Sequence, residues 1–211
     1  MLTLYYAPGA CSMAPHIVLE EIGVPFEAKP VAMLKGEHLQ AAFQTINPRG
    51  KVPVLVVDGQ SLTENIAILT YLAERHPEAH LLPSDPWSRA QVLSTLAWIA
   101  SSVHTSFGPL FMAQRFVQDE PGREQLVASM RRAIDGYFSE IDQMLAGKEW
   151  AFGTYSIVDP YLFVYFSWAK NFFRLDVSRF PHYEAHAQRL LARPAVQRAL
   201  AREAETRTQA A

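Results

Sequence analysis

YYAPGACSMAPH, residues 5–16, is the stretch that decides the fold of this chain. It follows a β-rich segment, turns at Pro8-Gly9 and continues as a helix from about Met13, which indicates a strand–loop–helix unit. Cys11, the single cysteine, lies where that helix begins. Because N–H groups at a helix start lack intrahelical partners and the helix dipole is positive there, we expect a lowered pKa for the Cys11 thiol. Ser12 adds a hydroxyl donor at this corner. The alternative is a small buried cysteine in a loop.

Strand and helix patterns alternate over residues 1–77. Asp58-Gly59 between two β-rich runs is a strong hairpin signal. The expected elements are strands at 1–6, 26–33, 52–57 and 61–62, and helices at 14–22, 37–45 and 64–75. The order is therefore β-α-β-α-β-β-α, in which the early strands form a parallel pair and the last two an antiparallel hairpin.

The remainder of the chain has helical periodicity only. Val92, Leu96, Ile99 and Val103 are spaced by three and four residues, and residues 161–168 are apolar nearly all round, as in a buried central helix. Residues 78–86 are rich in Pro, His, Ser and Asp, which is typical of a linker. We therefore expect an α/β domain at residues 1–77, a linker at 78–86 and an all-helical domain at 87–211.

Composition excludes several classes of function. The 211 residues carry a formal net charge of −2 with interspersed charges, which argues against a nucleic-acid or membrane-surface partner. A single cysteine excludes an internal disulfide and a cysteine-cluster metal site, and a free thiol suits a reducing compartment. The first residues enter a strand pattern directly, without a secretory signal. We expect a cytoplasmic protein with no metal.

Several motifs, in this order and spacing, resemble those of cytosolic glutathione S-transferases and, among them, the bacterial beta class. They are Tyr5-Tyr6-x-Pro8-Gly9-x-Cys11-Ser12, Asn47-Pro48-x-Gly50-x-Val52-Pro53, Leu62-Thr63-Glu64-x-x-Ala67-Ile68, Ala100-Ser101-x-Val103-His104 and Ser156-x-x-Asp159-x-Tyr161. The resemblance spans nearly the whole chain. It implies a thioredoxin-like first domain, a helical second domain with a hydrophobic co-substrate pocket, glutathione binding and a homodimer.

The resemblance also implies a glutathione site in the first domain. The bond before Pro53 corresponds to the family's cis-proline, and the Val52 backbone would pair with the peptide backbone of glutathione. At the start of the third helix, Glu64 and Asn65 would hold the γ-glutamyl group, although the family usually has Ser or Gly in place of Asn65. Lys35 is a candidate for the glycyl carboxylate, with a solvated surface lysine as the alternative. Ala10 would line this site beside Cys11.

The catalytic candidates are Cys11, Ser12 and His104. His104 lies in the motif that the beta class turns towards the cysteine, where a cation would favour an ionised thiol. Phe107, Phe111 and Trp168 are candidates for the apolar pocket, although aromatic residues of a helical domain also form its core.

Together these features predict a glutathione transferase whose thiolate attacks small hydrophobic electrophiles, as in detoxification. Two alternatives stay open. Cys11 could form a mixed disulfide with glutathione in thiol–disulfide or peroxide reduction, with glutathione as the resolving thiol. The fold could also bind hydrophobic ligands without catalysis. The identity of the electrophile is not fixed by this sequence.

Overall fold

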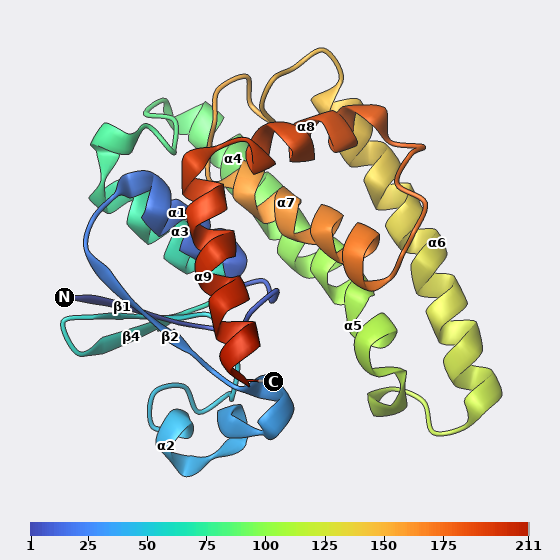
Figure 1. Ribbon diagram of the computed structural model, residues 1–211. Helices are drawn as coiled ribbons and strands as arrows, with labels where there is room; N and C mark the ends of the chain where they lie inside the picture. Colours follow the sequence, from blue (N-terminus) through green and yellow to red (C-terminus); the bar gives the residue numbers. More distant parts are fainter. Residues whose placement is uncertain (211) are drawn as a thin grey trace.

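The computed structural model describes residues 1–210, and side chains through residue 206 (Figure 1). An N-terminal α/β unit precedes a larger helical unit, as predicted. The first unit contains β1 (Leu2–Tyr6), α1 (Met13–Ile22), β2 (Phe26–Pro30), α2 (Ala41–Gln44), β3 (Val54–Val57), β4 (Gln60–Thr63) and α3 (Asn65–Arg75). The second contains α4 (Pro86–Trp98), α5 (His104–Met112), α6 (Glu120–Leu145), α7 (Val158–Ser167), α8 (Pro181–Leu191) and α9 (Pro194–Ala210). The predicted linker at 78–86 remains a prediction.

The four strands form one mixed sheet in the order β2-β1-β3-β4. Strand β1 pairs in parallel with β2 and antiparallel with β3, and β3 pairs antiparallel with β4. Asp58 and Gly59, with φ of 49° and 87°, make the β3–β4 turn, as the sequence predicts. Helices α1 and α3 cover one face of this sheet, and α2 lies on the other (Figure 1). This is the predicted thioredoxin-like arrangement.

The predicted helix at 37–45 is wrong in its extent. Residues 37–39 form a 3-10 turn, Gln40 is extended with φ −76° and ψ 148°, and α2 covers only Ala41–Gln44. Phe43 is the only residue of α2 that is buried, so this segment lacks the apolar face that would hold a longer helix. The predicted strand at 26–33 likewise ends at Pro30, and a 3-10 turn, η1 (Met33–Lys35), follows it.

Two π turns lie in the described part of the second unit. Residues 99–103 join α4 to α5, and residues 168–172 extend α7. His104 follows the first π turn and Trp168 begins the second. Such turns change which side chains face a neighbouring element and are frequent at functional sites. No helix in the described chain is long and apolar enough to cross a membrane.

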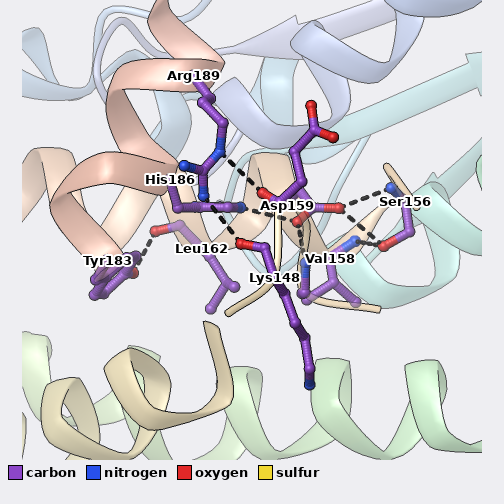
Figure 2. Close-up of polar contacts among 10 residues, drawn as sticks. Lys148, Ser156, Val158, Asp159, Leu162, Tyr183, His186 and Arg189 are labelled. Carbon is purple, nitrogen blue, oxygen red and sulfur yellow. Dashed lines mark hydrogen bonds and ion pairs between the residues drawn. The ribbon is translucent and has the colours of Figure 1, made fainter. Parts of the chain in front are cut away.

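Helix α7 is the buried centre of the helical unit, and Asp159 fixes its start. The Asp159 carboxylate is fully buried and accepts a hydrogen bond from the backbone N–H of Ser156 at 2.7 Å (Figure 2). It also accepts one from the backbone N–H of Ala151 at 2.9 Å. His186 of α8 lies 2.9 Å from the same carboxylate. The reach of Asp159 back to the N–H of Ser156 is one half of a capping box, in which a residue of the first turn binds the backbone three positions before it. The Ser156 hydroxyl, however, accepts from the N–H of Val158, at 3.3 Å.

Helix α9 returns from the helical unit onto α1 (Figure 1). Arg193 binds the carboxylate of Glu21 through two nitrogens at 2.6 and 2.9 Å, and Arg198 contacts Glu20 at 2.7 Å. Bidentate geometry makes the first of these pairs specific as well as attractive. The last helix of the chain therefore anchors the helical unit to the helix that follows the Cys11 loop.

Candidate functional site

A cavity of about 410 Å³ lies where the two units meet. On one side the walls come from the loop after β1, the start of β3 and the start of α3. On the other side they come from α5 and α7. The lining residues are Ala10, Cys11, Met33, Asn47, Arg49, Lys51, Val52, Pro53, Thr63, Glu64, Asn65, Ile66, Ala100, His104, Thr105, Tyr161 and Trp168. The predicted site residues Ala10, Cys11, Val52, Pro53, Glu64, Asn65, His104 and Trp168 are therefore brought together.

The loop that carries Cys11 is held at Gly9 from the helical unit. The N–H of Gly9 donates to Glu203 at 2.7 Å, and its carbonyl accepts from the indole N–H of Trp168 at 2.7 Å. Gly9 has φ of +78°, and a Cβ there would lie 3.0 Å from the ring of Phe172, so a larger residue would be strained. Both backbone groups two residues before Cys11 are thus fixed by residues distant in sequence.

Cys11 lines the cavity, but the pKa of its thiol differs from the value expected from the sequence. Its thiol lies 3.7 Å from the carbonyl oxygen of Val52, and the residue as a whole is only 9% exposed. Burial raises the pKa of Cys11 to about 11, even though Asn65 and Lys51 act in the opposite direction. The predicted lowering by the helix start is wrong because loss of solvation outweighs the helix terminus. At neutral pH, Cys11 is a thiol.

Ser12 is not part of the cavity wall. Its hydroxyl accepts from the N–H of Ala7 at 3.1 Å and donates to the carbonyl of Ala7 at 3.2 Å. The side chain is fully buried. The structure therefore uses Ser12 to close the loop before α1, and it does not bring the predicted catalytic hydroxyl to the cavity.

The backbone at the start of β3 and α3 forms the opposite wall. The Val52–Pro53 bond is cis, as the resemblance implies, and both residues line the cavity. Glu64 precedes α3 with φ of 71° and ψ of 125°, a backbone conformation that is costly for a residue with a side chain and clusters at functional sites. Among the described residues no side chain caps α3, so its first N–H groups remain available beside the Glu64 carboxylate.

Asn65 turns inwards from the first position of α3. It is 7% exposed, and its side chain lowers the pKa of both Cys11 and Tyr161, against the larger effect of their burial. Its carbonyl oxygen, Oδ1, is buried without a partner in the described chain. An unpaired buried acceptor is unfavourable, so this oxygen is free for a donor from a bound molecule.

Two cations line the cavity, and Lys35 is not one of them. Lys35 lies exposed at the end of η1. Arg49 lies 3.6 Å from Glu64 and donates to the Thr63 hydroxyl at 3.2 Å, and Lys51 follows two residues later. Neither Arg49 nor Lys51 was among the site residues expected from the sequence. Two basic residues on either side of Gly50, directly before Val52-Pro53, could have indicated an anion-binding turn at this place.

The buried side chain of Asn47 holds the turn that presents these cations. Its amide donates to the carbonyl of Lys51 at 2.8 Å, and its oxygen accepts from the N–H of Arg49 at 3.1 Å. Gly50, with φ of +60°, allows close approach to His38, whose carbonyl oxygen would lie 2.8 Å from an added Cβ. A rigid turn thus carries both positive charges.

His104 enters the cavity from α5 as a neutral ring. Burial and the charge of Lys51 lower its pKa, while Glu64 has a smaller opposite effect. This corrects the expectation that His104 acts as a cation near the thiol. Its Nδ1 lies 3.1 Å from the hydroxyl of Tyr165, and its ring packs edge-on against Trp168, with centroids 5.4 Å apart.

The three predicted pocket aromatics have different places. Trp168 lines the cavity. Phe107 is fully buried and packs against Trp168, Phe138 and Phe173, so it belongs to the core. Phe111 is 47% exposed, and its ring centroid lies 5.1 Å from that of Trp168. Phe111 therefore extends the aromatic surface beyond the cavity. Tyr161 also lines the cavity. The sequence did not indicate this, because Tyr161 belongs to a helix that is apolar nearly all round and was therefore expected in the core.

Within the described chain, no cluster of three His, Cys, Asp or Glu side chains could hold a metal ion.

Residues 1–74 match the family model for the glutathione S-transferase N-terminal domain. Over 207 residues, the chain is 35% identical to glutathione S-transferase GstA of Escherichia coli O157:H7, covering 96% of this chain and 98% of that protein.

Solved structures agree with this match. A bacterial beta class glutathione S-transferase from Sphingomonas chungbukensis is 36% identical with a TM-score of 0.84, covering 95% of this chain and 98% of that one. A glutathione transferase homologue from Sulfitobacter, solved with bound glutathione, is 30% identical with a TM-score of 0.87, covering 93% and 95%. The chain therefore belongs to the glutathione S-transferase family and resembles its bacterial beta class.

Proposed function

We propose that this protein joins glutathione, through its thiolate sulfur, to a small hydrophobic electrophile. The observation that carries the proposal is the composition of the cavity at the domain junction. It combines the backbone of Val52 before the cis-proline, an uncapped helix start beside Glu64 and Asn65, and an aromatic wall at Trp168. These are the groups that an extended tripeptide with one ammonium and two carboxylate groups, and an apolar co-substrate, require.

Glutathione would lie along Val52 as an added strand. The Glu64 carboxylate would bind its ammonium group, and the N–H groups at the start of α3 would bind the adjacent carboxylate. Arg49 and Lys51 are the cations of the cavity wall, and we propose that Lys51, rather than Lys35, neutralises the glycyl carboxylate.

Chemistry would take place at the glutathione sulfur. The thiol loses its proton, the resulting thiolate forms a C–S bond with the electrophile, and the leaving group departs with its electron pair. Trp168 and Phe111 would hold the apolar electrophile beside the sulfur, and proximity supplies much of the rate. Cys11 remains protonated at neutral pH and so does not compete as a nucleophile.

Conjugation kinetics with chlorodinitrobenzene on the wild type and Cys11→Ala test this function. The proposal expects conjugation by both proteins, with kcat/KM of the variant within about tenfold of the wild type. Loss of conjugation in Cys11→Ala with unchanged glutathione binding would instead favour the mixed-disulfide alternative, for which the location of Cys11 in the cavity is the supporting observation. Glutathione binding without turnover in conjugation and reductase assays would favour the ligand-binding alternative.

We further propose that the protein acts as a cytoplasmic homodimer with separate domains at 1–77 and 87–211. The free thiol of Cys11 suits a reducing compartment. Sedimentation equilibrium would test the dimer, and a monomeric mass at all concentrations would contradict it.

A further inference from the structure

A buried hydrogen bond joins His104 to the centre of the helical unit. The Nδ1 atom of His104 lies 3.1 Å from the hydroxyl of Tyr165, which is fully buried on α7. Trp168 packs against the same imidazole ring. The other ring nitrogen, Nε2, has no hydrogen-bond partner in the part of the chain that the structure describes, while the ring itself lines the cavity. One nitrogen is thus held by the protein and the other is left for a bound molecule.

The chemistry of the two groups sets the direction of this bond. A phenol hydroxyl is a strong donor and a weak acceptor, whereas a neutral imidazole nitrogen is a strong acceptor. Burial raises the pKa of Tyr165 well above its ordinary value, so the hydroxyl keeps its proton, and burial lowers the pKa of His104, so the ring is neutral. When Nδ1 accepts a hydrogen bond, the single proton of a neutral imidazole lies on Nε2.

We propose that Tyr165 is a positioning residue that fixes His104 in the Nε2–H tautomer, so that a neutral imidazole donates a hydrogen bond to the glutathione thiolate. The part of this inference that concerns glutathione rests on the proposed function. The glutathione thiol releases its proton to solvent, and His104 keeps its own proton throughout. The thiolate is therefore stabilised by a fixed donor and not by a titrating base.

The surroundings of His104 favour this arrangement. The ring of Tyr161 packs edge-on against the ring of Tyr165, with centroids 5.1 Å apart, and encloses the Tyr165 side chain on α7. The groups that act electrostatically on His104 are Lys51, which lowers its pKa, and Glu64, which raises it, both from the first unit. On its other side the ring meets the aromatic rings of Tyr165 and Trp168. The hydroxyl of Tyr165 is thus the one protein group that contacts a nitrogen of this ring in the described chain.

Imidazole 15N NMR tests the tautomer without any substrate. The full-length protein is labelled at histidine, and the His104 signals are assigned with His104→Gln. In the wild type at neutral pH we expect a protonated Nε2 and an unprotonated Nδ1. In Tyr165→Phe we expect both signals to move towards values of a tautomer mixture. A protonated Nδ1 in the wild type overturns the proposal even if the variant fails to fold, as do unchanged signals in a folded Tyr165→Phe.

Tyr183→Phe is the matched control for lost stability. Tyr183 is equally buried, and its hydroxyl donates to the carbonyl of Leu162 at 2.6 Å instead of to a histidine nitrogen (Figure 2). This variant loses a buried phenol hydrogen bond on the neighbouring helix, and we expect it to leave the His104 signals unchanged. A change of the same size in both variants would overturn the specific role of Tyr165.

The catalytic consequence appears in the pH profile of conjugation. Without the fixed donor, the thiol pKa of bound glutathione rises. A rise from, for example, about 7 to about 8 should lower kcat/KM of Tyr165→Phe about tenfold at low pH, with recovery at alkaline pH. A deficit that is constant with pH would overturn the proposal. If no protein shows conjugation while the tautomer changes as expected, the proposed function fails and the tautomer assignment stands.

Discussion

Glu203 lies on the last helix, α9, but it supports the loop that carries Cys11 near the start of the chain. Its loss should therefore disturb the candidate site. Its carboxylate is fully buried and has two partners, the N–H of Gly9 at 2.7 Å and Nδ1 of His16 at 3.2 Å. Glu203→Ala leaves both groups unpaired inside the protein. The first lies in the loop that carries Cys11, and the second lies on α1 behind that loop. Both the stability of the fold and the geometry of the cavity should therefore respond.

The magnitude follows from these two contacts. A hydrogen bond to a charged group contributes about 1.5–3 kcal/mol, and each methylene removed from a buried site costs about 0.8 kcal/mol. Part of this is offset because the variant no longer buries a charge. We expect a loss of about 3–5 kcal/mol in the free energy of unfolding, which lowers Tm by roughly 6–20 °C in a chain of this size.

Urea and thermal unfolding of Glu203→Ala, with Glu205→Ala as the control, measure this effect. Glu205 is an exposed residue of the same helix, so its removal should change the unfolding free energy by less than about 0.5 kcal/mol. In Glu203→Ala, KM for glutathione should also rise, since Gly9 lies two residues before Cys11. If the two variants are equally stable, the buried carboxylate holds neither Gly9 nor His16, and the expected loss is wrong.

Three further experiments, one on the wild type and two on variants, test other parts of the structure. Because its pKa of about 11 keeps Cys11 protonated, alkylation by iodoacetamide should be slow at pH 7.5 and accelerate up to about pH 11; a rate equal to that of a free thiol at pH 7.5 would contradict the burial. Asp159→Ala leaves the N–H groups of Ser156 and Ala151 unpaired and should cost about 3–5 kcal/mol in urea unfolding, and a loss below about 1 kcal/mol would show that these contacts are weak. Gly50→Ala brings a Cβ within 2.8 Å of the His38 carbonyl oxygen, so calorimetry should show weaker glutathione binding, and unchanged affinity would exclude this turn from the site.

Local signals explain why the framework could be predicted from the sequence. The Pro8-Gly9 loop and the Asp58-Gly59 turn each depend on residues close together in the chain, and each is found as expected. The helical periodicity of residues 92–103 likewise corresponds to buried positions at Val92, Leu96, Ile99 and Val103.

The site differs from its prediction where distant segments decide the environment. The helix start favours a Cys11 thiolate, but burial against the helical unit reverses the direction in which the pKa moves. The neutrality of His104 follows from burial and from Lys51, which lies far away in sequence. The π turns that precede His104 and begin at Trp168 leave no simple periodic signature. These effects depend on contacts between distant segments, so they cannot be predicted from the spacing of residues along the chain.

Binding of glutathione in this cavity and ionisation of its thiol there underlie every functional proposal made for this protein. An ultraviolet titration of the thiolate absorbance of bound glutathione measures that pKa directly, and Cys11→Ala removes the protein's own thiol from the signal. We expect a thiol pKa for bound glutathione below that of free glutathione, with the difference reduced in Cys11→Ala/His104→Ala. A bound thiol that titrates at the same pH as free glutathione would show that the cavity does not ionise it.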